Sequence, residues 1–376
     1  EFRRVLFRSL KDLTVGKQQL IEIAKALTQN ANILILDEPT SALTESEAEI
    51  LFEILNKLKN QGVSSIYISH KLDEVFAIAD TVTVLRDGRT ISTDPIERLT
   101  ENDIVSKMVG RELTEFYPYE ERQIGEEVLR VNNYSFYDKE TQEELVSNVS
   151  SVLRKGEILG VSGLMGAGRT ELFISLFGGY SGKKHGEVYI DGELVHLNKP
   201  IDSINKGLAY VSEDRKRYGL VPEMNIIKNT TLASLKKVKR SQLLDEDLEL
   251  EISEKYAKKM NLKAHSLEAL VGQLSGGNQQ KVVLSKWLLT DPKILILDEP
   301  TRGIDVGAKF EIYKVIVDLA KQGVGIVIIS SELQEVLGMS DRILVMAEGS
   351  IAGELARSEA TQEKIMKLAT MGSGTQ

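Results

Sequence analysis

The chain has 376 residues, of which 42% are hydrophobic and 27% are charged, and its formal net charge is −9 at pH 7. This length predicts two globular domains, and the negative charge argues against a nucleic-acid-binding protein that works by bulk electrostatics. The absence of cysteine excludes disulfides and thiolate metal sites, and no apolar run reaches the roughly 18 residues of a membrane span, so a membrane role would require a partner protein.

The first nine residues, EFRRVLFRS, differ in character from the rest of the chain, because they are strongly basic and begin with Glu. We leave 1–9 unassigned and expect a truncation or assembly artefact. A targeting peptide is the alternative, but no small-residue cleavage site follows the basic stretch.

An internal repeat with an offset of 261 residues dominates the sequence. The first copy contains LTVGKQQ at 13–19 and ILILDEPT at 33–40. These runs match LSGGNQQ at 274–280 and ILILDEPT at 294–301 in the second copy. The alignment runs without a gap to Gly88 and Gly349. A repeat of this length sets the domain plan.

Apolar runs alternate with amphipathic stretches in both copies, which is typical of an α/β fold with a parallel sheet. The first copy predicts helices at 20–27, 45–60 and 72–78 and strands at 33–36, 65–69 and 81–85, and the second copy repeats this order from 277 to 349. Residues 101–126 are charged and are interpreted as a linker. The predicted domains are therefore 10–100 and 127–369, with a disordered tail at 370–376.

The second domain contains more sequence than the repeat covers. We expect strands at 128–131, 147–153 and 187–190, bounded by glycine turns. The highly charged stretch 236–259 is predicted to be helical, and it would form a helical subdomain between the glycine-rich loop at 163–170 and the second LSGG run.

A strand at 157–162 leads into GLMGAGRT at 163–170, which has the spacing of a phosphate-binding loop with Arg169 in place of Lys. In such a loop, backbone N–H groups and the following helix N-terminus surround phosphate oxygens, and the Thr170 hydroxyl would bind Mg²⁺. Because a guanidinium is larger and planar, we expect nucleotide to bind here but to be poorly placed for hydrolysis. The predicted contacts are Gly163, Gly166, Ala167, Gly168, Arg169, Thr170 and Glu171.

An Asp-Glu pair follows each ILIL run. Asp37 and Asp298 end apolar strands, where a carboxylate can bind Mg²⁺, and Glu38 and Glu299 are placed to orient or deprotonate a water. A helix cap is the structural alternative, but the Pro-Thr that follows in both copies favours the functional interpretation.

His70 ends a strand shortly after the first Asp-Glu pair, and this position suits a contact with a γ-phosphate. A packed or solvated histidine is the ordinary alternative. The second copy has Ser331 at the matching position, so we expect it to have lost that contact.

The LSGG run is predicted to open a helix whose first N–H groups and positive dipole end face a phosphate. An ordinary capped helix is the alternative. The predicted contacts are Ser275, Gly276, Gly277 and Gln279 in the second copy and Thr14, Gly16 and Gln18 in the first, where Val15 adds a branched side chain.

These residues together resemble the ATP-binding cassette ATPases, which are P-loop NTPases. More narrowly, the chain is similar to the tandem-cassette subunits of bacterial monosaccharide importers of the xylose, ribose and galactose type. The stretches that carry this resemblance are MVGRELTEFYP at 108–118, SEDRKRYGLVP at 212–222, LSGGNQQK at 274–281 and DEPTRGIDVGAKFEIY at 298–313.

The resemblance implies two cassettes that close face to face on two ATP molecules, each phosphate loop facing the opposite LSGG helix. The loop 163–170 would then face 13–19, and Glu213 would stand where the family has a lid glutamine that contacts Mg²⁺. This site combines Arg169, Thr14 and Ser331, so we expect binding or gating with little hydrolysis.

The competent site would use the helix that starts at Ser275 with Asp37, Glu38 and His70. By the offset of the repeat, its phosphate loop would begin about a hundred residues before residue 1. We therefore expect the first cassette to be incomplete, the chain to be N-terminally truncated and this fragment to hydrolyse ATP slowly or not at all.

The resemblance implies an ATPase that energises monosaccharide import, with ATP and Mg²⁺ as cofactors and no other metal. Its partners would be transmembrane permease subunits, docked near Glu213–Tyr218, and indirectly a periplasmic sugar-binding protein, with no nucleic acid. It would lie peripherally on the cytoplasmic face of the bacterial membrane. The alternatives are a non-hydrolysing nucleotide-binding fragment and a soluble tandem-cassette ATPase acting on ribosomes, which the short acidic segment 101–125 disfavours.

Overall fold

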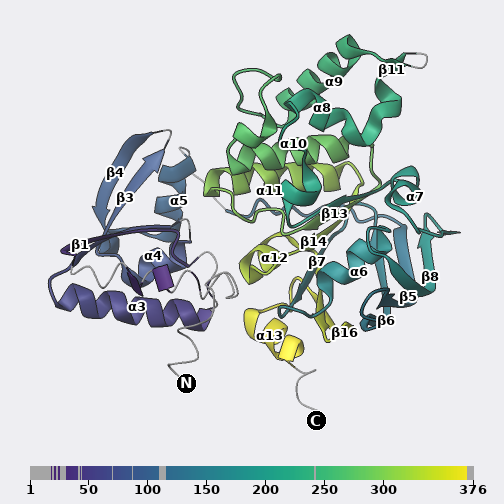
Figure 1. The fold of residues 1–376 in the computed structure, drawn as a ribbon. Coiled ribbons are helices and arrows are strands. Elements are labelled where there is room, and N and C mark those ends of the chain that lie inside the picture. The colour runs from purple at the N-terminus through teal and green to yellow at the C-terminus, as the bar shows by residue number, and fades with distance from the viewer. Residues whose placement is uncertain are drawn as a thin grey trace. The chain divides into compact units, whose positions relative to one another are not determined.

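The computed structural model describes residues 18, 21–22, 24–25, 31–40, 43, 45–69, 71–86, 88–109, 116–240 and 243–370. The chain divides into two compact units, Glu1–Thr114 and Glu115–Gln376 (Figure 1). No helix in these ranges combines the length and the apolar character needed to span a bilayer.

A six-stranded sheet forms the centre of the second unit. Its strands follow the order β10-β13-β14-β7-β15-β16, in which the first five are parallel and β16 is antiparallel. All residues of β13 and β14 are buried, which explains why their sequences are continuous apolar runs. The bounds are β7 Ile158–Gly163, β10 Leu208–Val211, β13 Ile294–Asp298, β14 Gly325–Ile329, β15 Arg342–Ala347 and β16 Ser350–Ala356.

Helices cover this sheet, and α10 and α11 lie beside β13 and β14 in Figure 1. Eleven residues of α10 are buried, so this helix lies inside the unit. The bounds are α6 Arg169–Leu176, α7 Pro200–Asn205, α10 Gly276–Leu288, α11 Val306–Lys321, α12 Leu333–Met339 and α13 Gln362–Thr370.

A second, antiparallel sheet of the order β6-β5-β8-β9 packs on the same core. The predicted strands are present but longer than expected, because β5 and β6 continue beyond the apolar residues as a paired ribbon. The bounds are β5 Glu127–Asp138, β6 Glu144–Arg154, β8 Gly182–Ile190 and β9 Glu193–Leu194.

The helical segment beyond α10 contains α8 Ile226–Thr231 and α9 Glu246–Lys259, with short helices η3 Arg215–Gly219, η4 Leu232–Val238 and η5 Val271–Gln273. The prediction of one helix over 236–259 was wrong for its first part, where the strands β11 Lys239–Arg240 and β12 Leu243–Leu244 pair. The helix begins only at Glu246 because the Asp245 side chain caps it by accepting from the Leu248 N–H.

The first unit repeats the second element by element. Seven elements of the second unit, β13, α11, β14, α12, β15, β16 and α13, recur in the first at the offset of 261. In the same order, their counterparts are β1 Ile33–Asp37, α3 Glu45–Asn60, β2 Ser64–Ile68, α4 Leu72–Ile78, β3 Thr81–Arg86, β4 Arg89–Pro95 and α5 Glu101–Val109. Individual bonds are also repeated. Thr40 donates to Glu74 at 2.6 Å, and Thr301 donates to Glu335 at 2.8 Å. The internal repeat therefore extends to the fold of the described elements.

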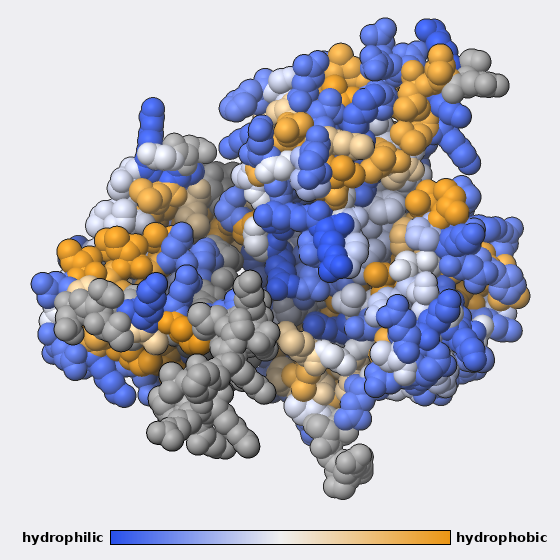
Figure 2. Space-filling view, viewed as in Figure 1, coloured by the Kyte–Doolittle hydropathy of each residue, from blue (hydrophilic) through white to orange (hydrophobic). Residues whose placement is uncertain are grey.

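The two units differ in what surrounds these repeated strands. In the second unit β7 lies between β14 and β15, whereas the described part of the first unit contains two separate pairs, β1-β2 and β3-β4. Ile35 of β1 is consequently 65% exposed, and its counterpart Ile296 is completely buried. Figure 2 shows the apolar residues gathered over β1 on the surface of the first unit.

The predicted linker 101–126 is not a linker over most of its length. Residues 101–109 form α5, which buries Ile104 and Val105 in the first unit. Residues 116–126 pack on the second unit, where Phe116 contacts Tyr313 edge to face. Charge density predicts a solvated connection, but Ile104 and Val105 are buried in the first unit and Phe116 and Tyr117 pack partly buried on the core of the second. Residues 110–115 and 371–376 lie outside the described residues, and Thr370 ends α13.

Candidate active site

The glycine-rich loop joins the carboxyl end of β7 to α6, at the edge where parallel sheets bind ligands. Gly168 has φ +87°, and a Cβ there would lie 2.9 Å from the Leu145 carbonyl oxygen. A Cβ at Gly163 would lie 2.4 Å from the Met346 carbonyl oxygen. At Gly166, by contrast, a Cβ would meet nothing within 4 Å, so open space adjoins the middle of the loop.

Arg169 reaches into the site. Its Nη1 donates to the Ser330 carbonyl at 2.9 Å, at the end of β14. Its charge also lowers the pKa values of Asp298 and Glu299, although burial dominates both groups. The guanidinium therefore lies among the carboxyl ends of three neighbouring strands.

Asp298 lies at the end of β13 and is 1% exposed. Burial raises its pKa, while the hydroxyls of Tyr210 and Thr170 and the charge of Arg169 oppose that shift. Tyr210 donates to Oδ2 at 2.7 Å, whereas Oδ1 has no hydrogen-bond partner. A buried carboxylate oxygen left without a donor, next to a hydroxyl, is a donor set that fits Mg²⁺.

Glu299 has a left-handed backbone with φ +47° and accepts a hydrogen bond from the Ser331 N–H at 2.8 Å. Burial raises its pKa to about 7, against the opposing effects of Ser331 and Arg169. A carboxylate with this pKa can exchange a proton near neutral pH, which suits a general base.

Glu213 lies in the segment before η3, where its carboxylate forms an ion pair with Arg302. Both side chains are partly exposed, at 41% and 62%. The predicted metal ligand is therefore paired with a cation in this structure, and its role at Mg²⁺ remains a prediction.

The LSGG run opens α10, with Ser275 at the N-cap, where its hydroxyl accepts from the Asn278 side-chain amide at 2.9 Å. The glycines also have a packing role. A Cβ at Gly276 would lie 2.7 Å from the Gly303 carbonyl oxygen, and one at Gly277 would lie 2.5 Å from the Ala308 Cβ.

Gln279 is 4% exposed, and its amide donates to the carbonyls of Leu274 and Val271 at 3.1 and 3.3 Å. Its side chain thus holds the preceding turn. The predicted contact with nucleotide stays a prediction.

In the first unit, Asp37 ends β1 and Glu38 repeats the left-handed backbone of Glu299, with φ +48°. The Glu38 N–H donates to the Ile68 carbonyl at 2.9 Å, as Glu299 does to Ile329. Gln18 is helical and exposed, and Thr14, Gly16 and His70 lie outside the described residues.

The structure brings Arg169, Thr170, Asp298 and Glu299 together in the second unit. Sequence reasoning missed Tyr210, whose hydroxyl orients Asp298, and Arg215, whose guanidinium contacts the loop at 302–303. Nothing in the sequence pairs β10 with β13, so the Tyr210 contact could not be found. Arg215 lies inside the stretch SEDRKRYGLVP, which indicates a family but does not show which residues Arg215 contacts.

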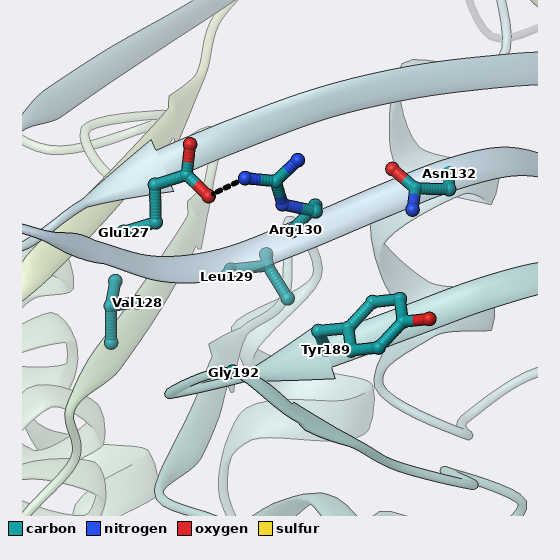
Figure 3. A pocket seen from close by; sticks show the side chains of 7 residues that line it. All are labelled: Glu127, Val128, Leu129, Arg130, Asn132, Tyr189 and Gly192. Atoms are coloured by element: carbon teal, nitrogen blue, oxygen red, sulfur yellow. Dashed lines mark hydrogen bonds and ion pairs between the residues drawn. The ribbon is translucent and has the colours of Figure 1, made fainter.

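Figure 3 shows a separate cavity of about 410 Å³, lined by residues of β5, β8 and the turn after β8. Its ion pair, Arg130 with Glu127, is exposed, and the lining contains none of the predicted site residues. Over the described ranges, no group of three or more acidic or histidine side chains could hold a metal by itself. A metal at Asp298 would thus need further ligands from a nucleotide and from water.

Comparisons with known proteins agree with this geometry. A family model described as "ABC transporter" matches residues 2–41 and 146–302. The xylose import ATP-binding protein of Geobacillus kaustophilus is 66% identical over 363 residues, which cover 96% of this chain and 72% of that protein. The ribose import ATP-binding protein of Caldanaerobacter subterraneus is 50% identical over 366 residues, covering 97% and 72%.

Solved structures show the same fold. A nucleotide-binding cassette of an ABC transporter superposes with a TM-score of 0.56 at 23% identity, covering 64% of this chain and 98% of that one. A dimeric cassette bound to ADP and Pi superposes with a TM-score of 0.53 at 21% identity, covering 61% and 98%. At these identities the likeness concerns the fold alone.

Proposed function

Because this chain belongs to the ABC transporter family, we propose that it is the ATP-binding subunit of an importer whose cargo is D-xylose or a related monosaccharide. The observation that carries the enzymatic part is the convergence of Thr170, Asp298 and Glu299 beside the open side of the glycine loop. The relatives named for xylose and ribose import support the choice of cargo.

In this proposal the loop 163–170 and the start of α6 bind the phosphates of ATP. Thr170 and Asp298 Oδ1 would hold Mg²⁺, which would supply positive charge beside the phosphates. Tyr210 donates to the other oxygen of Asp298 and so leaves Oδ1 available as a ligand. Glu299 accepts a proton from the attacking water.

We propose that the two units belong to two unequal nucleotide-binding cassettes, and that the site at 163–170 hydrolyses ATP slowly. Its Arg169 is bound to the Ser330 carbonyl, and Ser331 replaces the histidine of the first copy. Asp37, Glu38 and His70 would serve a faster site of the first cassette. The Arg169 contact and the replacement by Ser331 also favour a second candidate function, in which the site at 163–170 binds nucleotide without hydrolysing it.

As such a subunit, the protein would bind transmembrane permease subunits at the cytoplasmic face of the bacterial membrane, while a periplasmic protein delivers the sugar. Copurification of the chain with a coexpressed xylose permease in membranes would support this assignment. Copurification with ribosomes instead would favour a soluble ATPase of the same fold.

Binding of a fluorescent ATP analogue with and without Mg²⁺ tests the site. Asp298→Asn should weaken the Mg²⁺-dependent part about tenfold or more, because it removes the charged metal ligand. Asp191→Asn, in a surface turn, is the control. Equal binding by all three proteins would refute the site. Single-turnover assays then separate slow hydrolysis from binding alone.

A further inference from the structure

Glu335, in the first turn of α12, is an acidic residue that is only 1% exposed. The Thr301 hydroxyl donates to its Oε1 at 2.8 Å, whereas Oε2 has no hydrogen-bond partner among the described residues. Thr301 follows β13 and α12 follows β14, so this carboxyl group connects the segments after both strands. A charged carboxylate buried with so few donors is costly, and the neutral acid avoids that cost.

The charges around Glu335 also favour its neutral form. The Lys309 ammonium of α11 bonds to both carboxylate oxygens of Glu332 at 2.6 and 2.7 Å, so it is engaged by another acid. Burial raises the pKa of Glu335, and the like charge of Glu332 adds to this rise. The groups that oppose the rise without cancelling it are the hydroxyls of Ser330 and Thr301 and the charge of Lys309.

Glu74 is the counterpart of this residue in the first unit, at the offset of 261, and it has the opposite surroundings. Thr40 donates to its Oε1 at 2.6 Å, and the Lys71 ammonium pairs with the same oxygen at 3.1 Å. The hydroxyls of Tyr67 and Ser69 donate to Oε2 at 2.8 and 3.1 Å. Burial acts to raise the pKa of this carboxyl group, but the hydroxyls of Thr40 and Tyr67 and the Lys71 ammonium outweigh burial and lower it. The first copy therefore holds a carboxylate.

Two sequence differences between the copies account for this contrast. Ile328 stands at the position of Tyr67, which removes a hydroxyl donor. Glu332 stands at the position of Lys71, which exchanges a cation for an anion. Tyr313 of α11 brings another hydroxyl near the acid, but it also has no hydrogen-bond partner among the described residues. The same place in the fold is thus set up for two different charge states.

The segments that Glu335 connects also carry the candidate general base, Glu299. Thr301 lies two residues after Glu299. Ser330, whose hydroxyl interacts with the Glu335 carboxyl group, precedes Ser331. The Ser331 N–H in turn donates to Glu299 Oε1 at 2.8 Å. A group that bonds to both Thr301 and Ser330 therefore helps to keep Glu299 against the N–H that holds it.

We propose that Glu335 is a positioning residue of the site at 163–170 that acts as a neutral carboxylic acid, whereas Glu74 supports the matching segments of the first unit as a carboxylate. The neutral acid keeps the two segments in place without adding a second negative charge near Glu299. The consequence for hydrolysis rests on the proposed function, but the charge state of Glu335 and its hold on the two segments do not.

The same substitution in both copies tests the two charge states. Glu335→Gln replaces a neutral acid by a neutral amide of the same shape, so the urea midpoint at pH 7, followed by Trp287 fluorescence, should be at or above that of the wild type. Glu74→Gln turns an amide group toward hydroxyl donors and should lower the midpoint of the first unit, followed by circular dichroism. Similar losses in the two variants would overturn the proposal.

Infrared difference spectra at pH 7, each taken between the wild type and one variant, detect the proton directly. Glu335→Gln should remove the C=O stretch of a protonated carboxyl group, whereas Glu74→Gln should remove the stretches of a carboxylate. Loss of carboxylate stretches in both variants would overturn the charge state proposed for Glu335.

Hydrogen exchange of the nucleotide-free protein tests the hold on the two segments. The Ser331 amide should exchange severalfold faster in Glu335→Ala than in the wild type, and at the wild-type rate in Glu335→Gln. Thr301→Val removes the same hydrogen bond from the other side with a smaller change in volume, so it should also speed exchange and serves if Glu335→Ala does not fold. Unchanged exchange in Thr301→Val would overturn the positioning role.

Single-turnover hydrolysis of Mg²⁺–ATP tests the consequence for the reaction. Glu335→Ala should lower the rate about tenfold or more while it binds a fluorescent ATP analogue as the wild type does, because Glu299 is misplaced and the phosphate loop is not. Glu335→Gln should keep the wild-type rate, and an equal loss in both variants would overturn the neutral role. If the wild type binds no nucleotide or does not hydrolyse it, the proposed function fails, and the spectra and the exchange rates still judge Glu335.

Discussion

Glu299 illustrates how the setting of one carboxyl group shapes a site. The residue follows a fully buried strand, its backbone is left-handed, and the Ser331 N–H holds one of its oxygens. Burial outweighs this hydrogen bond and the nearby Arg169, so the pKa rises to about 7. Folding therefore favours the protonated form of Glu299 at mildly acidic pH.

The raised pKa means that the folded chain binds more protons than the unfolded chain between the ordinary value of 4.5 and about 7, so stability falls as pH rises through that window. Glu299→Gln stays neutral. Between pH 5 and pH 8, its free energy of unfolding should rise by up to roughly 3 kcal/mol relative to that of the wild type. Urea unfolding at several pH values measures this change. A difference that does not change with pH would contradict the raised pKa.

Gly168 shows a second kind of constraint at the residue scale, since it combines φ +87° with backbone atoms of Leu145 and Gly349 at 2.9 and 3.0 Å from any Cβ. Gly192 has a similar φ of +79° but open space around it.

We therefore predict that Gly168→Ala destabilises the second unit by more than Gly192→Ala does. The control should lose about 1 kcal/mol from backbone strain alone, and Gly168→Ala about 2–4 kcal/mol because the neighbouring backbone must also move. Chemical unfolding of the two variants measures the difference. Equal losses would mean that the loop relaxes without cost.

At the scale of elements, the repeated aspartates at the start of β3 and β15 have different surroundings. Asp341 accepts from the Ile158 N–H at 2.7 Å and the Tyr119 hydroxyl at 3.0 Å, and it pairs with Arg122, whose side chain is 5% exposed. It thereby ties the segment 116–126 to β7 and β15. Its counterpart Asp80 is 73% exposed and pairs with Lys59 at 2.5 Å.

Asp341→Ala should cost about 3–5 kcal/mol, because it leaves the Arg122 charge buried without a partner. Asp80→Ala removes an exposed pair and should cost less than about 1 kcal/mol. Urea unfolding followed by the single Trp287, in the second unit, reports the first change. Circular dichroism reports the second. Similar costs for the two variants would contradict this difference in burial.

For the whole molecule, the main contrast is between two copies of the same strands with unequal cores. The second unit contains one large cluster of buried side chains around β7 and β13. Among the described residues of the first unit, the cluster under β1 and β2 buries Leu34, Leu36, Leu51 and Leu55. Only one face of β1 is buried, whereas both faces of β13 are.

This contrast predicts that the same substitution has very different effects on stability in the two copies. Ile35→Lys should change the stability of this chain by no more than about 0.5 kcal/mol, since the side chain already faces solvent. Ile296→Lys places an unpaired charge in the core and should cost more than about 4 kcal/mol or prevent folding of the second unit. Thermal unfolding of both variants measures this. Loss of folding in Ile35→Lys would show that its face is covered.

The elements and the repeat can be predicted from the sequence, because periodicity and capping residues are local properties of the chain. The bounds of 45–60 and 72–78 were predicted to the residue, and the glycine loop, Asp298 and Glu299 were found from their order after apolar strands. Charge density does not show which charged stretches are solvated, so it predicts a linker at 101–109 although Ile104 and Val105 are buried there.

Which strands are neighbours, and therefore which side chains meet, depends on the three-dimensional fold. Tyr210 meets Asp298 because β10 lies beside β13, and Arg169 meets Ser330 because β7 lies beside β14. The same residues ILIL are half exposed in one copy and fully buried in the other. Burial depends on what packs against a strand, and that information is not local to its sequence.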